Sequence, residues 1–150
     1  MQREATSSGV SRETQGEAPE TQKQRILIVD DNEDMRSMLG LLLKRATYQV
    51  LFAEDGQAAL IQANEYHPDL ILMDLSLPNI TGWEAVGLLR KMPDFRETPI
   101  IAVSAHVSIA DQERALAVGC SLHLAKPFKT SVLLQIIADL LTAGERTHET

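Results

Sequence analysis

Residues 70–78 read LILMDLSLP, an apolar run that an aspartate closes and a proline follows. Leu70 to Met73 are apolar at successive positions rather than alternating ones, which is typical of a strand covered on both faces of a sheet. Similar short runs occupy residues 26–29, 100–103 and 122–125, and a more mixed one occupies 48–53. The chain is therefore expected to contain five strands, most of them buried on both faces.

Helical patterns lie between and after these runs. The clearest has apolar residues at Leu133, Ile136, Ile137, Leu140 and Leu141. The others are carried by Met35, Met38, Leu39 and Leu42, by Ala59, Leu60 and Ala63, by Val86 and Leu89, and by a fourth helix over 110–118. Thr81 with Glu84 makes a capping box, and Ser108 with Asp111 makes a weaker version of it.

Five strands alternating with five helices predict an α/β fold with a doubly wound, five-stranded parallel sheet, because parallel strands need crossover connections. The folded unit is expected over residues 25–143 as a single domain. Residues 1–24 are too poor in apolar side chains to order themselves and are expected to be a disordered leader, or the remnant of a linker. Residues 144–150 begin with a glycine that suits a helix end and are expected to be a flexible tail.

Composition narrows the functional classes. The 150 residues include 14 Lys and Arg against 21 Asp and Glu, so the net charge is −7 and direct binding to nucleic acid is not expected. The hydrophobic fraction of 44% with only 4% aromatics predicts an aliphatic core. One cysteine and no membrane-spanning or signal-peptide pattern indicate a cytoplasmic protein.

Polar groups directly follow four of the predicted strands. Asp30-Asp31 follows the first strand, Asp74 the third, Ser104 the fourth and Lys126-Pro127 the fifth. Any one such aspartate is commonly a helix cap or a turn residue. Together, however, they fall at the carboxyl edge of the sheet, where doubly wound folds bind their ligands.

Three carboxylates at one edge repel one another unless a cation shares the site. Oxygen ligands without thiolates or clustered imidazoles favour a hard ion, and an open site with few carboxylates suits Mg²⁺. The site then has the parts of a phosphoryl-transfer centre: Asp74 as nucleophile, with the metal, the Lys126 ammonium and the Ser104 hydroxyl to meet the charge on the phosphoryl oxygens.

The ordered set of motifs resembles the receiver domain of two-component response regulators, a flavodoxin-like (βα)5 fold. The residues that carry the resemblance are Asp30-Asp31, Asp74, Gly82, Ser104-Ala105 and Lys126-Pro127-Phe128, and the match covers residues 25 to 143. The resemblance implies that Asp74 accepts a phosphoryl group from a phosphohistidine on a sensor histidine kinase or histidine phosphotransfer protein.

The resemblance also implies the remaining roles. Asp31 and Asp74 would ligate Mg²⁺ directly, Asp30 would ligate it through water, and the main-chain carbonyl of Ser76 would complete the protein ligands. Lys126 and Ser104 would bind phosphoryl oxygens, and Lys126-Pro127 would form the family's cis peptide.

By the same resemblance, Ala105, His106, His123 and Pro127 would modulate the switch. The water that hydrolyses the acyl phosphate would lie between Ser76 and His106. At position 123 the family couples the hydroxyl movement to an aromatic side chain, so the histidine is a departure. His123 is either such a switch residue or an edge-strand residue that faces solvent.

The leading hypothesis is a stand-alone phosphorylation switch whose output is protein contact through residues 108–141, because the chain carries no output domain after residue 143. A receiver-like binding module that works without phosphorylation is the alternative. An Mg²⁺-dependent phosphatase typically has a second aspartate two residues after the nucleophile, where this chain has Ser76. A flavin site is disfavoured because acidic residues follow the first strand in place of a Ser/Thr/Gly-rich phosphate loop. Trp83 is expected to pack at the start of a helix rather than bind a ligand.

Overall fold

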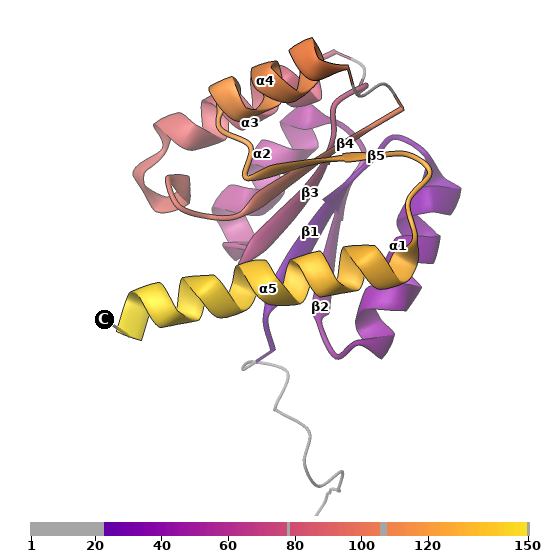
Figure 1. The fold of residues 1–150 in the computed structure, drawn as a ribbon, viewed down its shortest axis with the longest axis vertical. Coiled ribbons are helices and arrows are strands. Elements are labelled where there is room, and N and C mark those ends of the chain that lie inside the picture. The colour runs from indigo at the N-terminus through magenta and orange to yellow at the C-terminus, as the bar shows by residue number, and fades with distance from the viewer. Residues whose placement is uncertain (1–22, 78, 106–107, 150) are drawn as a thin grey trace, which may run out of the picture.

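The computed structural model describes the backbone of residues 23–77, 79–105 and 108–149, with side chains up to Ala143. Five parallel strands form one sheet in the order β2-β1-β3-β4-β5, and helices cover both of its faces (Figure 1). The predicted doubly wound α/β fold is confirmed.

Each strand lies within one residue of its predicted position. The strands are β1 (Arg25–Val29), β2 (Gln49–Ala53), β3 (Leu70–Asp74), β4 (Ile100–Ser104) and β5 (Leu122–Ala125). Every residue of β3 and of β4 is buried, as the unbroken apolar runs predicted.

The helices follow the strands in turn. They are α1 (Glu33–Arg45), α2 (Gly56–Tyr66), α3 (Gly82–Lys91), α4 (Ile109–Val118) and α5 (Thr130–Glu149). A short 3-10 helix, η2 (Pro93–Phe95), was not predicted from the sequence. The expected end of the last helix at Gly144 is wrong, because α5 continues to Glu149. A glycine inside a helix costs only about 1 kcal/mol relative to alanine, so by itself it is a weak stop signal.

Two apolar layers hold the helices to the sheet. Leu39 and Leu43 of α1 and Leu133 and Ile137 of α5 pack on one face of the strands. The other face is covered by small and aliphatic residues of α2, α3 and α4, namely Ala59, Ala63, Ala85, Val86, Leu89 and Ala115. Phe95 is the one aromatic side chain among the described buried core residues, so the predicted aliphatic core is confirmed.

The first helix packs most of its predicted apolar face on the sheet. Leu39 is buried, and Met35 and Leu42 pack against the core. Met38 was expected on the same face but is 48% exposed, whereas Leu43 is buried. Leu41 is also exposed, so apolar residues surround much of this helix and periodicity alone does not fix its buried side.

Side-chain caps start four of the helices at the carboxyl edge of the sheet. Asn32, Asp55, Thr81 and Ser108 each accept a hydrogen bond from a main-chain N–H of the first turn. Both halves of the predicted Thr81–Glu84 capping box are present. Because β1 and β3 are neighbours while their following strands lie on opposite sides, the crevice of the sheet opens between them. Within the described part of the chain, no helix has the length and apolar character needed to cross a membrane.

Candidate functional site

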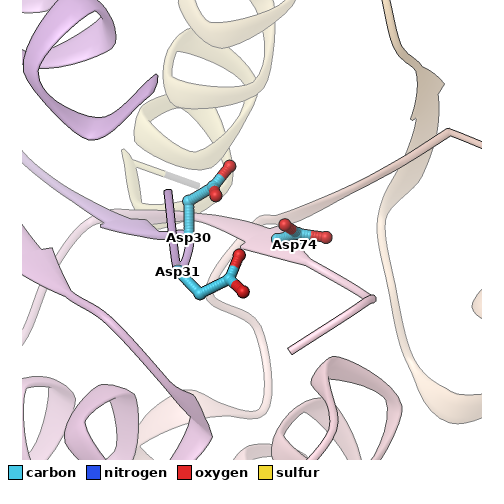
Figure 2. A group of neighbouring side chains, drawn as sticks. All are labelled: Asp30, Asp31 and Asp74. Carbon is cyan, nitrogen blue, oxygen red and sulfur yellow. The ribbon is translucent and has the colours of Figure 1, made fainter. Parts of the chain in front are cut away.

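Three carboxyl groups meet at the crevice between β1 and β3. Asp30 and Asp31 follow β1 directly, Asp74 is the last residue of β3, and one oxygen from each lies within 4.8 Å of the other two (Figure 2). Asp30 and Asp74 are buried, at 4% and 5% exposed, while Asp31 is exposed to solvent. The site is therefore a pair of buried carboxylates with a third at its open side.

Local hydrogen bonds fix the two buried carboxyl groups. The main-chain N–H of Asn32 donates to Oδ1 of Asp30 at 2.9 Å, and that of Ser76 donates to Oδ1 of Asp74 at 2.8 Å. Each is a bond from residue i+2, the pattern of an Asx-turn, so the chain turns sharply as it leaves the strand. In both carboxyl groups the second oxygen, Oδ2, faces the ammonium of Lys126.

Arg36 holds the loop that carries the first two aspartates. Its Nη1 donates to the main-chain carbonyl of Asp30 at 2.7 Å. Arg36 was not among the predicted site residues. Its position was readable, because Arg36 lies one helical turn after the Asn32 cap and on the same side of α1.

Lys126 lies between the two buried carboxylates. Its Nζ is 3.3 Å from Oδ2 of Asp30 and 3.4 Å from Oδ2 of Asp74. The Lys126–Pro127 peptide is cis, as the resemblance implied. Burial acts to lower the pKa of Lys126, but Asp74 and Asp30 together outweigh it and raise the pKa, so this ammonium stays charged.

Burial is the largest influence on Asp74 and raises the pKa of its carboxyl group. The Ser76 N–H and the Lys126 ammonium act in the opposite direction, and the nearby Asp30 carboxylate adds to the increase. Within the described part of the chain, Lys126 is thus the one ammonium beside these two buried carboxylates, and a second cation at this site would relieve the remaining repulsion.

The donor set fits Mg²⁺. It consists of carboxylate oxygens from three residues that already lie within reach of one common ion, with Asp31 on the open side where water can complete the coordination. No sulfur or imidazole ligand belongs to the cluster, which disfavours a soft metal.

Ser104 and His123 form a second pair near the same edge. Ser104, the buried last residue of β4, has its Oγ 2.7 Å from Nε2 of His123 on β5. His123 is half-buried, and its ring lies nearly perpendicular to the Trp83 ring, with 6.5 Å between the two centroids. Of the two expectations for His123, the solvent-facing one is wrong, because its side chain points into the contact between β4, β5 and α3.

The remaining predicted residues are placed as follows. Ala105 is exposed just beyond β4, and Ser76 is exposed in the loop after β3. His106 lies outside the described residues. Trp83 packs at the start of α3, as expected, and the guanidinium of Arg114 on α4 lies 4.2 Å from its ring centroid, a contact that the sequence did not indicate.

Comparison with known proteins assigns this arrangement to a family. Residues 26–138 match the response regulator receiver domain. The chain belongs to this family: it contains the receiver domain of a response regulator, a signalling module of two-component systems. Receiver domains are generally signalling modules rather than enzymes, bind Mg²⁺ at an acidic pocket, and interact with histidine kinases or phosphotransfer proteins.

The matches to individual relatives cover nearly the whole length of each relative. The polar-differentiation response regulator DivK of Brucella ovis is 34% identical over 116 residues, which cover 77% of this chain and 94% of DivK. The Vibrio cholerae chemotaxis protein CheY4 superimposes with a TM-score of 0.76 at 32% identity, covering 79% of this chain and 98% of CheY4. The receiver domain of the Pseudomonas aeruginosa sensor histidine kinase PA1611, with a magnesium ion coordinated in its active-site cleft, gives a TM-score of 0.74 at 34% identity and covers 80% and 98% of the two chains.

Proposed function

We propose that this protein is a stand-alone receiver that switches by Mg²⁺-dependent phosphorylation of Asp74. The observation that carries the proposal is the position of this carboxyl group, which is buried beside Asp30 and Asp31 and lies within 3.4 Å of the Lys126 ammonium. The match to DivK, which spans 94% of that relative, supports a receiver that acts without an attached output domain.

In the proposed reaction Asp74 attacks the phosphorus of a phosphohistidine on a sensor kinase or phosphotransfer protein. The new Asp74 oxygen–phosphorus bond forms as the nitrogen–phosphorus bond breaks, and the histidine leaves as a neutral imidazole after taking up a proton. Lys126 then moves from the carboxylates to a phosphoryl oxygen, and the Ser104 hydroxyl binds another.

Asp31 and Asp74 are proposed as direct ligands of Mg²⁺, with Asp30 binding through water and the Ser76 main-chain carbonyl as a further ligand. When bound, the ion neutralises charge on the transferring group. The i+2 hydrogen bonds to Asp30 and Asp74 support these roles, because they hold both buried carboxyl groups in place before any ion arrives.

Output is proposed to pass through the surface formed by α4, β5 and α5. Two large apolar side chains on α4, Ile109 at 76% and Leu116 at 58% exposed, support a protein-binding role for this surface. The Ser104–His123 contact links the same surface to the phosphorylation site, because His123 belongs to β5.

The test is the intact mass of the protein after incubation with acetyl phosphate. Wild type with Mg²⁺ should gain one phosphoryl group, and wild type without Mg²⁺ or Asp74→Asn with Mg²⁺ should gain none. Labelling of Asp74→Asn would contradict the assignment of the acceptor. If wild type stays unlabelled with both acetyl phosphate and phosphorylated histidine phosphotransfer proteins, the chain is instead a binding module that works without phosphorylation.

A further inference from the structure

Asp31 is held differently from the two carboxyl groups beside it. In Asp30 and Asp74, Oδ1 accepts a main-chain N–H and Oδ2 faces the ammonium of Lys126. Asp31 is exposed, and no hydrogen bond or ion pair joins its carboxylate to another residue that the structure describes. One of its oxygens nevertheless lies within 4.8 Å of an oxygen from each of the other two. The main chain on either side of Asp31 must therefore set the direction of this side chain.

Arg36 binds the main chain on both sides of Asp31. Its Nη1 donates to the carbonyl oxygen of Asp30 at 2.7 Å, and its main-chain N–H donates to the carbonyl oxygen of Asn32 at 3.0 Å. Because a peptide group is planar, holding the Asp30 carbonyl also fixes the direction in which the chain enters Asp31. The charged donor makes this hydrogen bond stronger than one between neutral groups. Arg36 therefore restricts the residue whose own side chain lacks a partner in the described part of the chain.

The stability of α1 does not explain an arginine at this position. Arg36 lies near the N-terminal end of the helix, where the macrodipole disfavours a cation. The first turn carries Glu33 and Asp34, and the basic residues Lys44 and Arg45 lie in the last turn, as the dipole favours. The guanidinium also lies beside a site that has to attract a metal cation. Its hydrogen bond to the main chain, rather than its charge, accounts for its place.

We propose that Arg36 is a positioning residue of the metal site, which directs the Asp31 carboxylate toward Mg²⁺ by holding the main chain around it and does not bind the ion itself. This inference rests on the proposed function, in which Asp31 is a direct ligand. Mg²⁺ requires nearly ideal octahedral coordination, whereas Ca²⁺ accepts a more irregular set of oxygen ligands. Arg36 therefore increases the preference of the site for Mg²⁺ over Ca²⁺.

The charge of Arg36 and its positioning role predict opposite effects on metal binding. If only the charge mattered, its removal would tighten the binding of any divalent cation, and by the same factor for Mg²⁺ and Ca²⁺, because both ions carry the same charge. Loss of orientation instead weakens Mg²⁺ binding, and weakens Ca²⁺ binding less. Removing a group that orients a metal ligand typically costs about 10- to 100-fold in affinity. The ratio of the two affinities therefore separates geometry from charge.

The experiment measures the dissociation constants of the full-length protein for Mg²⁺ and for Ca²⁺ by calorimetry. Arg36→Met removes the charge and the donor but keeps an unbranched apolar side chain. Arg36→Lys keeps the charge and replaces the planar guanidinium by an ammonium. Arg45→Met is the matched control, because it removes the same charge from an exposed position in the last turn of the same helix. Denaturant unfolding in EDTA shows whether each variant is folded without metal.

We expect Arg36→Met to bind Mg²⁺ about tenfold or more weakly than wild type, with a smaller loss for Ca²⁺, so that the preference for Mg²⁺ falls. Arg36→Lys should give an intermediate preference, and Arg45→Met should keep that of wild type. If Arg36→Met does not fold in EDTA, Arg36→Lys decides the question: a reduced preference supports the inference, and the wild-type preference overturns it.

Three other results would overturn the inference and leave the proposed function intact. They are tighter binding of both ions by Arg36→Met, an equal change in both affinities, and the same loss of preference in Arg45→Met. Failure of wild type to bind Mg²⁺ at all would be a different result, because it would contradict the proposed function itself, and the inference would fall with it.

Discussion

Among the residues that the structure describes, one ammonium group lies between two buried carboxylates. Lys126 lies within 3.4 Å of both Asp30 and Asp74, and the attraction of these carboxylates raises its pKa despite its partial burial. The same charge has two opposite effects: it stabilises the carboxylates at rest, and it repels a metal ion that approaches them. Lys126 is therefore expected to contribute to conformational switching more than to nucleophilic attack.

Replacing Lys126 by alanine should separate these effects. In Lys126→Ala the affinity for Mg²⁺, measured by calorimetry, should increase because a competing cation is gone, and labelling by acetyl phosphate should persist. The amide shifts that labelling produces in α4 and β5 should shrink, because no ammonium binds the phosphoryl oxygen. Lys129→Ala, at an exposed position nearby, is the control that should leave all three measurements unchanged. A complete α4 and β5 response in Lys126→Ala would contradict this role.

At the scale of elements, the site depends on how closely α3 begins against the end of β3. A Cβ atom added to Gly82 would lie 2.2 Å from the carbonyl oxygen of Asp74 and 2.6 Å from Cα of Leu75, both of them main-chain atoms. The capping box at Thr81 fixes the start of the helix at this point, so the helix cannot shift without losing its cap. The glycine thus lets the main chain at Asp74 and Leu75 pack in direct contact with the start of α3.

Two glycines of the same helix provide a matched pair of substitutions. Gly82→Ala should reduce the free energy of unfolding by roughly 1–3 kcal/mol and weaken Mg²⁺ binding, since the backbone of Asp74 must move. Gly87 has no atom within 4 Å of an added Cβ, so Gly87→Ala should stabilise the protein by about 0.5–1 kcal/mol without affecting Mg²⁺. Denaturant unfolding and calorimetry report the two quantities, and equal stability for both variants would argue against a tight contact at Gly82.

For the whole molecule, the site joins segments that are distant in the chain. Asp30, Asp74 and Lys126 come from the ends of β1, β3 and β5, which the sheet brings to one edge. A ligand that binds this edge requires the folded sheet and has no comparable site in the unfolded chain. Binding must therefore stabilise the fold as a whole.

Mg²⁺ at about one hundred times its dissociation constant should raise the free energy of unfolding by about 2.7 kcal/mol. Thermal unfolding with Mg²⁺ and with EDTA measures this difference. Asp31→Asn should diminish the gain by removing a ligand, whereas Asp94→Asn, an equal loss of charge at an exposed position in η2, should retain it. If both variants lose the same amount, the effect of Mg²⁺ is general screening rather than binding at this site.

The sequence alone was sufficient for the features that are local in the chain. Four short, mostly apolar runs and a fifth, more mixed one identified five strands to within one residue, and cap residues located the starts of α3 and α4, because these signals depend on neighbouring residues. It also placed Asp30, Asp31, Asp74 and Lys126 at one edge, since parallel strands end on the same side of a sheet.

Tertiary structure decided the features that depend on packing between distant segments. The bond between Ser104 and His123 follows from the register of β4 against β5, and the position of Arg114 over Trp83 follows from the packing of α4 beside α3. The buried side of α1 is likewise chosen by the sheet, which takes Leu39 and Leu43 rather than Met38. Local patterns fix which face a side chain can point to, but only the folded sheet fixes which residue it meets there.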